Sequence, residues 1–153
     1  MNIEITRIKT LFEDTIRGDN WTGINLQQAL QGIDATKATK RIHQQHLNIA
    51  ELTAHLTCWN LVIAKRLDAE NELPTIEEDF PIIHQLTEGK WQKIQNDAQI
   101  SFDILIDKLS EKLDDILEQP MFDGATSAYR NLHGQISHLH YHIGQIVLLK
   151  KIL

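Results

Sequence analysis

The residues best suited to chemistry lie near the end of the chain, where His138, His140 and His142 occupy every second position. Histidine is both a metal ligand and a proton-transfer group near neutral pH. In a strand, all three imidazoles would share one face. In a helix, His138 and His142 would be neighbours four residues apart, and His140 would lie elsewhere. The period of this segment therefore decides which histidines can act together.

The apolar residues around the histidines favour the helix. At about 100° per residue, His142 lies about 40° from His138, and Gln145 lies about 20° to the other side. The apolar residues fall roughly 80–160° away, whereas His140 lands near 200°. A strand would also have to continue through residues 144–151 without a partner strand. We therefore interpret the segment as a helix with an apolar stripe formed by Leu132, Ile136, Leu139, Ile143 and Ile146.

Two histidines four residues apart on a helix can chelate one metal ion, although the spacing alone is a weak motif, since both can simply be partly exposed. His55 strengthens it. In a helix beginning near Ile49, His55 lies within about 60° of Leu52 and about 40° of Trp59, on the apolar side. A buried imidazole needs a hydrogen-bonding or metal partner. His55 is therefore a satisfied core histidine or a third ligand, and the pair on another helix favours the second.

Four amphipathic segments must position these histidines. The first ends in a loop at residues 17–23, and residues 25–41 follow as a short helix broken near Gly32 and a polar connector. Asn48 can cap the second long helix, with Glu51 completing a capping box. The apolar stripe of the first is Ile5, Ile8, Phe12 and Ile16, and that of the second is Leu52, His55, Leu56, Trp59, Ile63 and Leu67.

The second half of the chain holds two more helices. An acidic, proline-containing stretch at residues 70–81 ends the second helix, and we expect a solvated loop there. The third long helix is predicted at about residues 91–117, and residues 118–126 turn the chain. Thr126 or Ser127 then caps a helix that runs nearly to the last residue. The apolar side of the third helix is predicted to contain Ile94, Ala98, Leu105, Leu109, Leu113 and Ile116.

Four such segments without a convincing strand predict an all-α fold, a four-helix bundle with long connections. The length suits one domain, and we expect residues 1–153 to form it. The single cysteine, Cys58, excludes an internal disulfide and a zinc ribbon. A net charge of −6 without a basic patch argues against nucleic acid as a partner. No apolar window is long enough to span a membrane, and the first ten residues contain no signal-peptide core, so we expect a cytoplasmic protein.

The segments that contain the histidines resemble the DinB-like superfamily. Residues 134–151, GQISHLHYHIGQIVLLKK, resemble its last helix, with the signature H-x-x-x-H-x-G-Q. Residues 49–60, IAELTAHLTCWN, resemble its second helix, where an aromatic residue follows an inward histidine by four positions. The resemblance covers essentially the whole chain. It implies an up-down-down-up bundle that is commonly a homodimer.

The resemblance also implies a function. It implies a divalent metal ion, above all nickel or zinc, with iron, manganese or cobalt as alternatives, held by His55, His138 and His142. Gly144 and Gln145 match the Gly-Gln of the signature and are expected to pack and to support the ligands. Relatives include thiol S-transferases and a thiol-dependent maleylpyruvate isomerase. A small-molecule substrate is therefore expected, with a low-molecular-weight thiol as one candidate.

Three neutral histidines leave a metal with at least one open position, where a thiolate or a water molecule can bind with a lowered pKa. We therefore expect a thiol-dependent S-transferase or a hydrolase, and the alternative is a metal-binding or structural dimeric bundle without turnover. His133, His140 and Tyr141 are candidates for the base. Both histidines lie off the ligand stripe and are expected at the surface, whereas Tyr141 could line the pocket or an interface.

Five other residues have two interpretations each. Glu51 could orient a histidine ligand, but its capping-box role is favoured. Cys58 could approach the metal, but a small buried hydrophobe is the commoner fate of a lone cysteine. Trp59 and Trp91 could belong to the core or to the pocket, and the core is favoured. Trp21, in a loop rich in glycine and asparagine, is the better candidate for lining a substrate entrance.

Overall fold

The computed structural model describes residues 2–44 and 46–153, and they form helices joined by loops. No β-strand occurs in this part of the chain, so the all-α prediction is confirmed. None of its helices is long and apolar enough to cross a membrane. The helices are α1 (Ile3–Ile16), α2 (Leu26–Leu30), α3 (Ala35–Thr39), α4 (Ile49–Arg66), α5 (Ile76–Asp79), α6 (Glu88–Ser110), the 3-10 helix η1 (Asp114–Ile116) and α7 (Ala128–Ile152).

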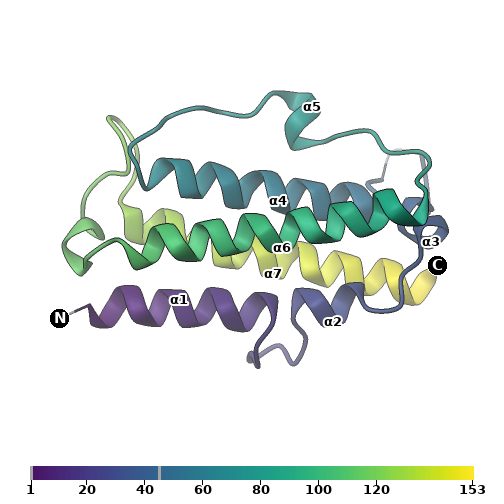
Figure 1. Ribbon diagram of the computed structural model, residues 1–153, viewed down its shortest axis with the longest axis horizontal. Helices are drawn as coiled ribbons and strands as arrows, with labels where there is room; N and C mark the ends of the chain where they lie inside the picture. The colour runs from purple at the N-terminus through teal and green to yellow at the C-terminus, as the bar shows by residue number, and fades with distance from the viewer. Residues whose placement is uncertain (1, 45) are drawn as a thin grey trace.

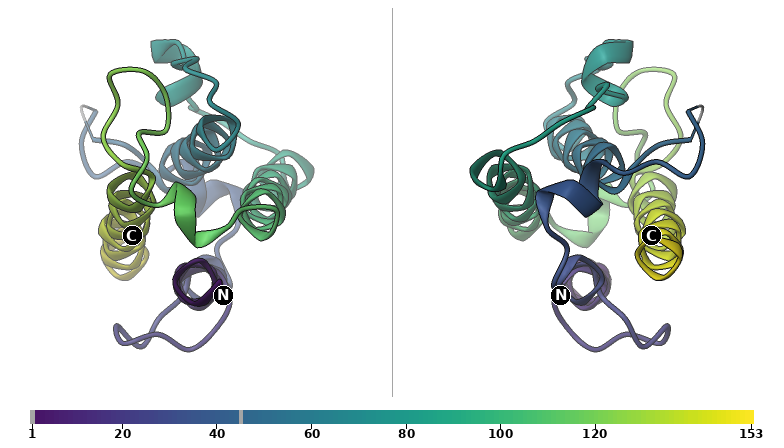
Figure 2. Two further views of the ribbon diagram at one scale, coloured as in Figure 1. Left: turned by 90° about the vertical axis from the view of Figure 1, so that its left-hand side faces the viewer. Right: turned by 90° about the vertical axis from the view of Figure 1, so that its right-hand side faces the viewer.

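The four long helices form a bundle. α1 and α7 run in one direction and α4 and α6 in the other, which is the up-down-down-up order (Figure 1). Seen end-on, the four lie at the corners of a square around the core, with η1 at one end and α3 at the other (Figure 2). α4 packs against both α6 and α7, and α1 packs against the same two helices from the opposite corner. The bundle prediction is therefore confirmed.

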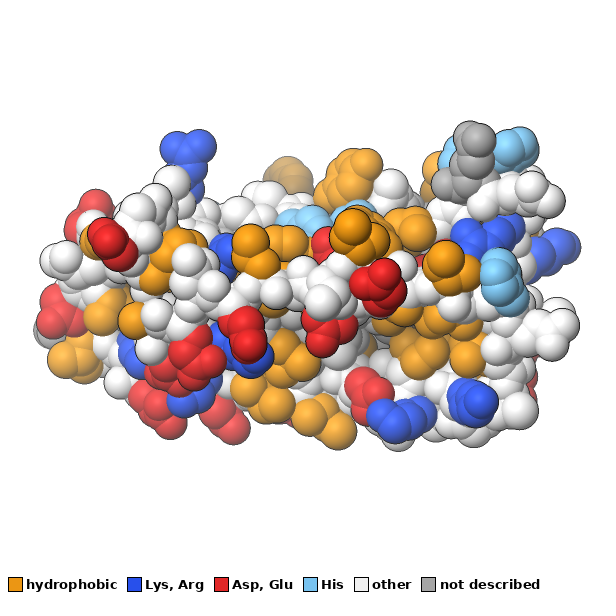
Figure 3. Space-filling view, turned by 90° about the horizontal axis from the view of Figure 1, so that it is seen from above, with side chains coloured by type: hydrophobic (Ala, Val, Ile, Leu, Met, Phe, Trp, Pro, Cys, Tyr) orange, Lys and Arg blue, Asp and Glu red, His pale blue; other side chains and the backbone are white. Residues whose placement is uncertain are grey.

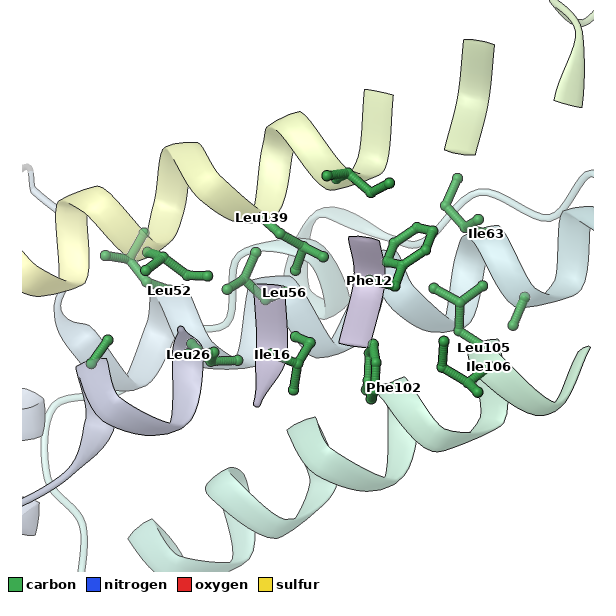
Figure 4. Close-up of a cluster of buried hydrophobic side chains, with 14 of the residues drawn as sticks. Phe12, Ile16, Leu26, Leu52, Leu56, Ile63, Phe102, Leu105, Ile106 and Leu139 are labelled. Atoms are coloured by element: carbon green, nitrogen blue, oxygen red, sulfur yellow. The ribbon is translucent and has the colours of Figure 1, made fainter. Parts of the chain in front are cut away.

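Apolar residues from all four long helices meet in one core (Figure 4). Burial of one such side chain stabilises the fold by about 1.5–3 kcal/mol. Leu56 and Leu139 are completely buried, and each adjoins a histidine, His55 in α4 and His138 in α7. Packing of these leucines therefore fixes the backbone from which the histidines project. The labelled core residues are Phe12, Ile16, Leu26, Leu52, Leu56, Ile63, Phe102, Leu105, Ile106 and Leu139.

The connection between α4 and α6 joins two parallel helices. Because the two helices are parallel, it must return along the whole of α4, whose 18 residues span about 27 Å. Residues 67–87 make this crossing on the outer side of α4, with α5 near the middle (Figure 1). Its far end is tied to the start of α4, where the side chain of Asn48 donates to the carbonyl oxygen of Ile83 at 2.7 Å. The crossover therefore covers one face of α4.

The prediction of the third long helix was wrong at both ends. α6 begins at Glu88, where the hydroxyl of Thr87 accepts the backbone N–H of Lys90. It ends at Ser110, and Leu113, expected on the apolar side, is 56% exposed.

Asp114 explains why α6 ends early. Its carboxylate accepts hydrogen bonds from the backbone N–H groups of Glu4 and Ile5, at 3.2 and 2.9 Å. These groups belong to the first turn of α1, which has no side-chain cap from Asn2. The chain must leave the axis of α6 to reach them, so a tertiary contact overrides the helical pattern.

Two further segments differ from the prediction. Residues 25–41 contain two helices, α2 and α3, which are separated at Gly32, whose φ is +74°. The side chain of Asn25 caps the start of α2, and that of Asp34 caps the start of α3. The expected loop at residues 70–81 contains α5. Of the two caps predicted for the last helix, Ser127 is the one observed.

Candidate metal centre

Three histidines from two helices converge beside the core. His55 lies in α4, and His138 and His142 lie one turn apart in α7. Nε2 of His138 is 2.9 Å from Nε2 of His55 and 2.9 Å from Nε2 of His142. His55 and His142 are buried, and His138 is partly buried. The structure thus brings together the three histidines predicted from the sequence.

The crossover holds the ring of His55. Its Nδ1 lies 2.7 Å from Oδ1 of Asp79 and 3.0 Å from the carbonyl oxygen of the same residue. Nε1–H of Trp59 donates to the same Oδ1 at 2.7 Å. The ring of Phe80 stacks on the imidazole, with centroids 4.4 Å apart and planes 15° from parallel. His55 is therefore fixed by residues that follow it by about twenty-five positions in the chain.

Two glutamines hold the histidines of α7 in the same way. Nδ1 of His138 lies 3.2 Å from Oε1 of Gln135, and Nδ1 of His142 lies 2.6 Å from Oε1 of Gln145. The amide nitrogen of Gln135 donates to Oδ1 of Asn60 at 2.9 Å, which leaves its oxygen for His138. Gln145 therefore has the supporting position that the family resemblance implied.

These contacts assign the ring protons. An oxygen acceptor faces every Nδ1, so each histidine donates from Nδ1 and is unprotonated at Nε2. The three Nε2 lone pairs then face one another, and a cation between them would satisfy all three. Two nitrogens bound to one zinc ion at about 2.0–2.1 Å can be at most about 4.2 Å apart, and Nε2 of His138 lies within this limit of both other Nε2 atoms. All three ligand atoms lie within 4.8 Å of one another. The cluster could therefore bind a metal ion.

The electrostatic setting keeps His138 and His142 neutral. The pKa of His138 is lowered to about 4, first by burial and then by the nearby His142 and His55. Burial is also the main cause that lowers the pKa of His142, against the opposing effect of the Gln145 hydrogen bond. Neutral imidazole is the form that binds metal, so His138 and His142 are ready to coordinate at pH 7.

The cluster lies near the surface, under the crossover. Seen from that side, histidine atoms show near the middle of the molecule, partly overlain by hydrophobic side chains (Figure 3). Tyr141 adjoins the cluster, with its ring 4.9 Å from that of His142 and its hydroxyl accepting from the amide of Gln145 at 3.3 Å. It is 64% exposed, so it lies at the rim of the centre. The prediction that Tyr141 could line the site agrees with this position.

The other two base candidates lie elsewhere. Nε2 of His140 is 3.1 Å from the hydroxyl of Thr15, so this ring faces the neighbouring helix α1 and not α4. The ring of His133 packs against Tyr129, with centroids 4.3 Å apart. Both are partly buried, whereas the sequence predicted exposed positions. Neither belongs to the cluster, in agreement with their place off the ligand stripe.

Glu51 has the capping role that the sequence favoured. Its carboxylate accepts the backbone N–H of Asn48 at 3.0 Å and that of Ile83 at 2.8 Å, and it pairs with Arg41. It is 1% exposed and fully engaged at the start of α4. Glu51 therefore does not orient His55, and Asp79 does so instead.

The remaining predictions were right in part. Trp91 is buried in the core, but Trp59 lies partly exposed at the centre, 6.0 Å from the ring of His138. Cys58 is partly buried rather than buried, and burial followed by the nearby Asp79 carboxylate raises the pKa of its thiol. Trp21 is fully exposed in the α1–α2 loop, on the side of the bundle opposite the crossover (Figure 1), so it does not line the centre.

Sequence reasoning missed Asp79 and Gln135. Asp79 lies in the acidic stretch that was interpreted as solvated surface, and no periodic signal links a crossover residue to a helix it passes over. Gln135 was within reach, because it precedes His138 by three residues and shares its helix face.

The comparison with protein families agrees with the geometry. The model of the DinB superfamily matches residues 21–146, and the chain therefore belongs to this superfamily. No curated protein and no solved structure matches the chain significantly. The family match and the histidine cluster together support a protein that could bind a metal ion.

Proposed function

We propose that this protein binds one divalent metal ion through Nε2 of His55, His138 and His142, and uses it in a reaction on a small molecule. The observation that supports this is the set of converging Nε2 atoms, each on a ring whose Nδ1 is already engaged. A histidine cluster that served only packing would gain from a proton shared between rings. Here an oxygen acceptor faces Nδ1 of every ring, which favours the tautomer with its proton on Nδ1 and not on Nε2.

When bound, the metal would lower the pKa of a coordinated thiol or water and stabilise its anion. The protein's own residues perform the remaining tasks. Asp79, Gln135 and Gln145 fix the three rings and their tautomers. Phe80 stacks on His55 and excludes water from one side. Three protein ligands leave room for a substrate atom.

A thiol-dependent S-transferase is the activity we favour. Bound to a metal held by these histidines, a thiol would be present as its thiolate, with its proton released to solvent, and would be a nucleophile without a further base. Water is a much weaker acid than a thiol, so a metal-bound water is more often assisted by a base, and the carboxylate held at this centre, Asp79, already accepts from His55 and Trp59. A hydrolase is therefore the second candidate, and metal binding without turnover is the third.

Nickel and zinc are the metals we favour, since imidazole suits both, with iron, manganese and cobalt as alternatives. We also propose a homodimer that acts on a small molecule, as the family implies. From charge and hydropathy we propose that it acts in the cytoplasm, with neither nucleic acid nor membrane as a partner.

The test uses untagged protein loaded with cobalt, whose absorption reports the ligands. Titration with a small thiol such as mercaptoethanol should produce a thiolate-to-metal charge-transfer band, and thiol transfer to an electrophile should follow. The His138→Ala variant should lose cobalt binding, the charge-transfer band and thiol transfer. The His140→Ala variant, from the same helix, should keep all three. If thiols leave the absorption spectrum of the cobalt-loaded protein unchanged, the transferase proposal is contradicted.

A further inference from the structure

Arg66, the last residue of α4, differs from the other described arginines in its surroundings. Its Nη1 donates to the amide oxygen of Asn131 at 3.3 Å, and its Nε is buried without a hydrogen-bond partner. No carboxylate in the described part of the chain pairs with it. By contrast, Arg130 is exposed, and three others form ion pairs with acidic side chains, namely Arg7, Arg17 and Arg41.

Two aromatic rings hold the guanidinium in place. Its carbon lies 5.7 Å from the centroid of the Trp59 ring and 5.4 Å from that of the Phe122 ring. Cation–π contacts recover part of the energy of removing the charge from water, but they supply no acceptor for Nε of Arg66. Burial lowers the pKa of Arg66, and no acidic neighbour counteracts it. The side chain is thus pre-positioned, and its charge is not neutralised.

Trp59 connects this guanidinium to the metal centre. Arg66 follows Trp59 by seven residues, which places both on one face of α4 within about 20°. The Trp59 ring is 5.7 Å from the guanidinium carbon and 6.0 Å from the ring of His138. The guanidinium therefore lies within the sum of these distances, about 12 Å, of a proposed metal ligand. A molecule that contacts both groups would therefore need to span about 12 Å or less.

Space adjoins Arg66 at the end of the bundle, and the three histidines do not line it. Arg66 lines a cavity of about 460 Å³ at the end of the bundle, between the end of α4 and the start of α7. Lys112 and Asp68 also line it, but they pair with each other at 2.9 Å. Arg66 is therefore the lining cation without an acidic partner, and much of the remaining wall is apolar, formed by Leu67, Ile116, Pro120, Met121 and Ala128.

We propose that Arg66 binds a carboxylate of the substrate, and that the substrate class is a thiol whose carboxylate lies several bonds from the sulfur. This inference rests on the proposed function, because the thiol end is placed at the metal centre. A guanidinium fits a carboxylate through paired N–H donors, and the bond is charge-assisted. The flanking rings reduce the entropy lost when the carboxylate binds, since the guanidinium is already ordered.

The experiment compares two series of probes on the cobalt-loaded protein. The first series is ω-mercaptoalkanoates, from mercaptopropionate to mercaptoundecanoate, and the second is the ω-mercaptoalkanols of the same lengths. The readout is the dissociation constant from the charge-transfer band, which requires no turnover. The carboxylate should improve affinity over the matched alcohol by about tenfold or more at intermediate lengths, where the chain spans the two sites, and not for mercaptopropionate.

Variants attribute the gain to Arg66. Arg66→Met keeps the apolar stem and should remove the gain while leaving the affinity for the alcohols unchanged. Arg66→Lys keeps the charge without the planar fork and should retain a smaller gain, which guards against loss of folding in the methionine variant. Arg130→Met, which removes an exposed charge from α7, is the matched control and should behave as the wild type.

Two outcomes would overturn different claims. If alcohols and carboxylates bind equally at every length, or if Arg66→Met keeps the gain, the assignment of Arg66 is wrong while the metal–thiol function stands. If no thiol of either series changes the spectrum of the cobalt-loaded protein, the proposed thiol function is wrong and the assignment of Arg66 fails with it.

Discussion

Asp79 gives the sharpest test of how the metal centre is built, because it reaches His55 from outside the helices. The Asp79→Ala substitution removes the carboxylate contact at 2.7 Å, but the carbonyl oxygen of residue 79 remains 3.0 Å from Nδ1 of His55. The ring therefore keeps one neutral acceptor and its tautomer. Loss of such a supporting group typically weakens metal binding by about 10–100-fold. With the carbonyl in place we expect about tenfold, or about 1.4 kcal/mol.

The assay is a competition titration of zinc or nickel against a chromophoric chelator. Glu77→Ala is the matched control, since Glu77 lies in the same short helix and is exposed. It should bind metal as tightly as the wild type. The alanine variant at position 79 should also unfold more easily without metal, by about 1–2 kcal/mol, because Nε1 of Trp59 loses its acceptor. Unchanged metal affinity in Asp79→Ala would refute the claim that the Asp79 carboxylate supports His55 as a metal ligand.

Three further predictions concern Gln135, Asp114 and Phe102. Gln135→Leu should weaken metal binding by about tenfold or more in the same titration, because the Nδ1 proton of His138 loses its acceptor. Hydrogen bonds from Ile5 and its neighbours lower the pKa of Asp114, so its stabilising effect is present above about pH 4 and is lost as the pH falls further. Chemical denaturation from about pH 6 to pH 3 should therefore show a shallower loss of stability in Asp114→Asn than in the wild type. Phe102→Ala removes a completely buried ring and should cost about 3–5 kcal/mol in the same measurement, with little effect on metal affinity per folded molecule.

Local patterns predicted most of the helices and the cluster itself. The period of the last helix separated His138 and His142 from His140, and the capping box of Asn48 located the start of α4. These features depend on residues a few positions apart, so a single sequence contains them. The inward position of His55 followed in the same way from its neighbours on the helix.

Contacts between distant segments could not be predicted in this way. Asp114 ends α6 because it caps α1, more than a hundred residues earlier, and no pattern within α6 signals this. Asp79 lies among exposed acidic residues and differs from them only because the crossover places it over His55. Arg66 has an ordinary position at a helix end, and only the packing of Trp59 and Phe122 makes it distinctive.

Metal stoichiometry tests the central claim most directly. Calorimetric titration of metal-free, untagged protein with zinc or nickel should show one ion per chain in the wild type and in His140→Ala. The His55→Ala, His138→Ala and His142→Ala variants should bind the metal at least about 100-fold more weakly. Circular dichroism should show that each variant is folded. Binding of equal strength in the wild type and these three variants, or no binding by the wild type, would contradict the account.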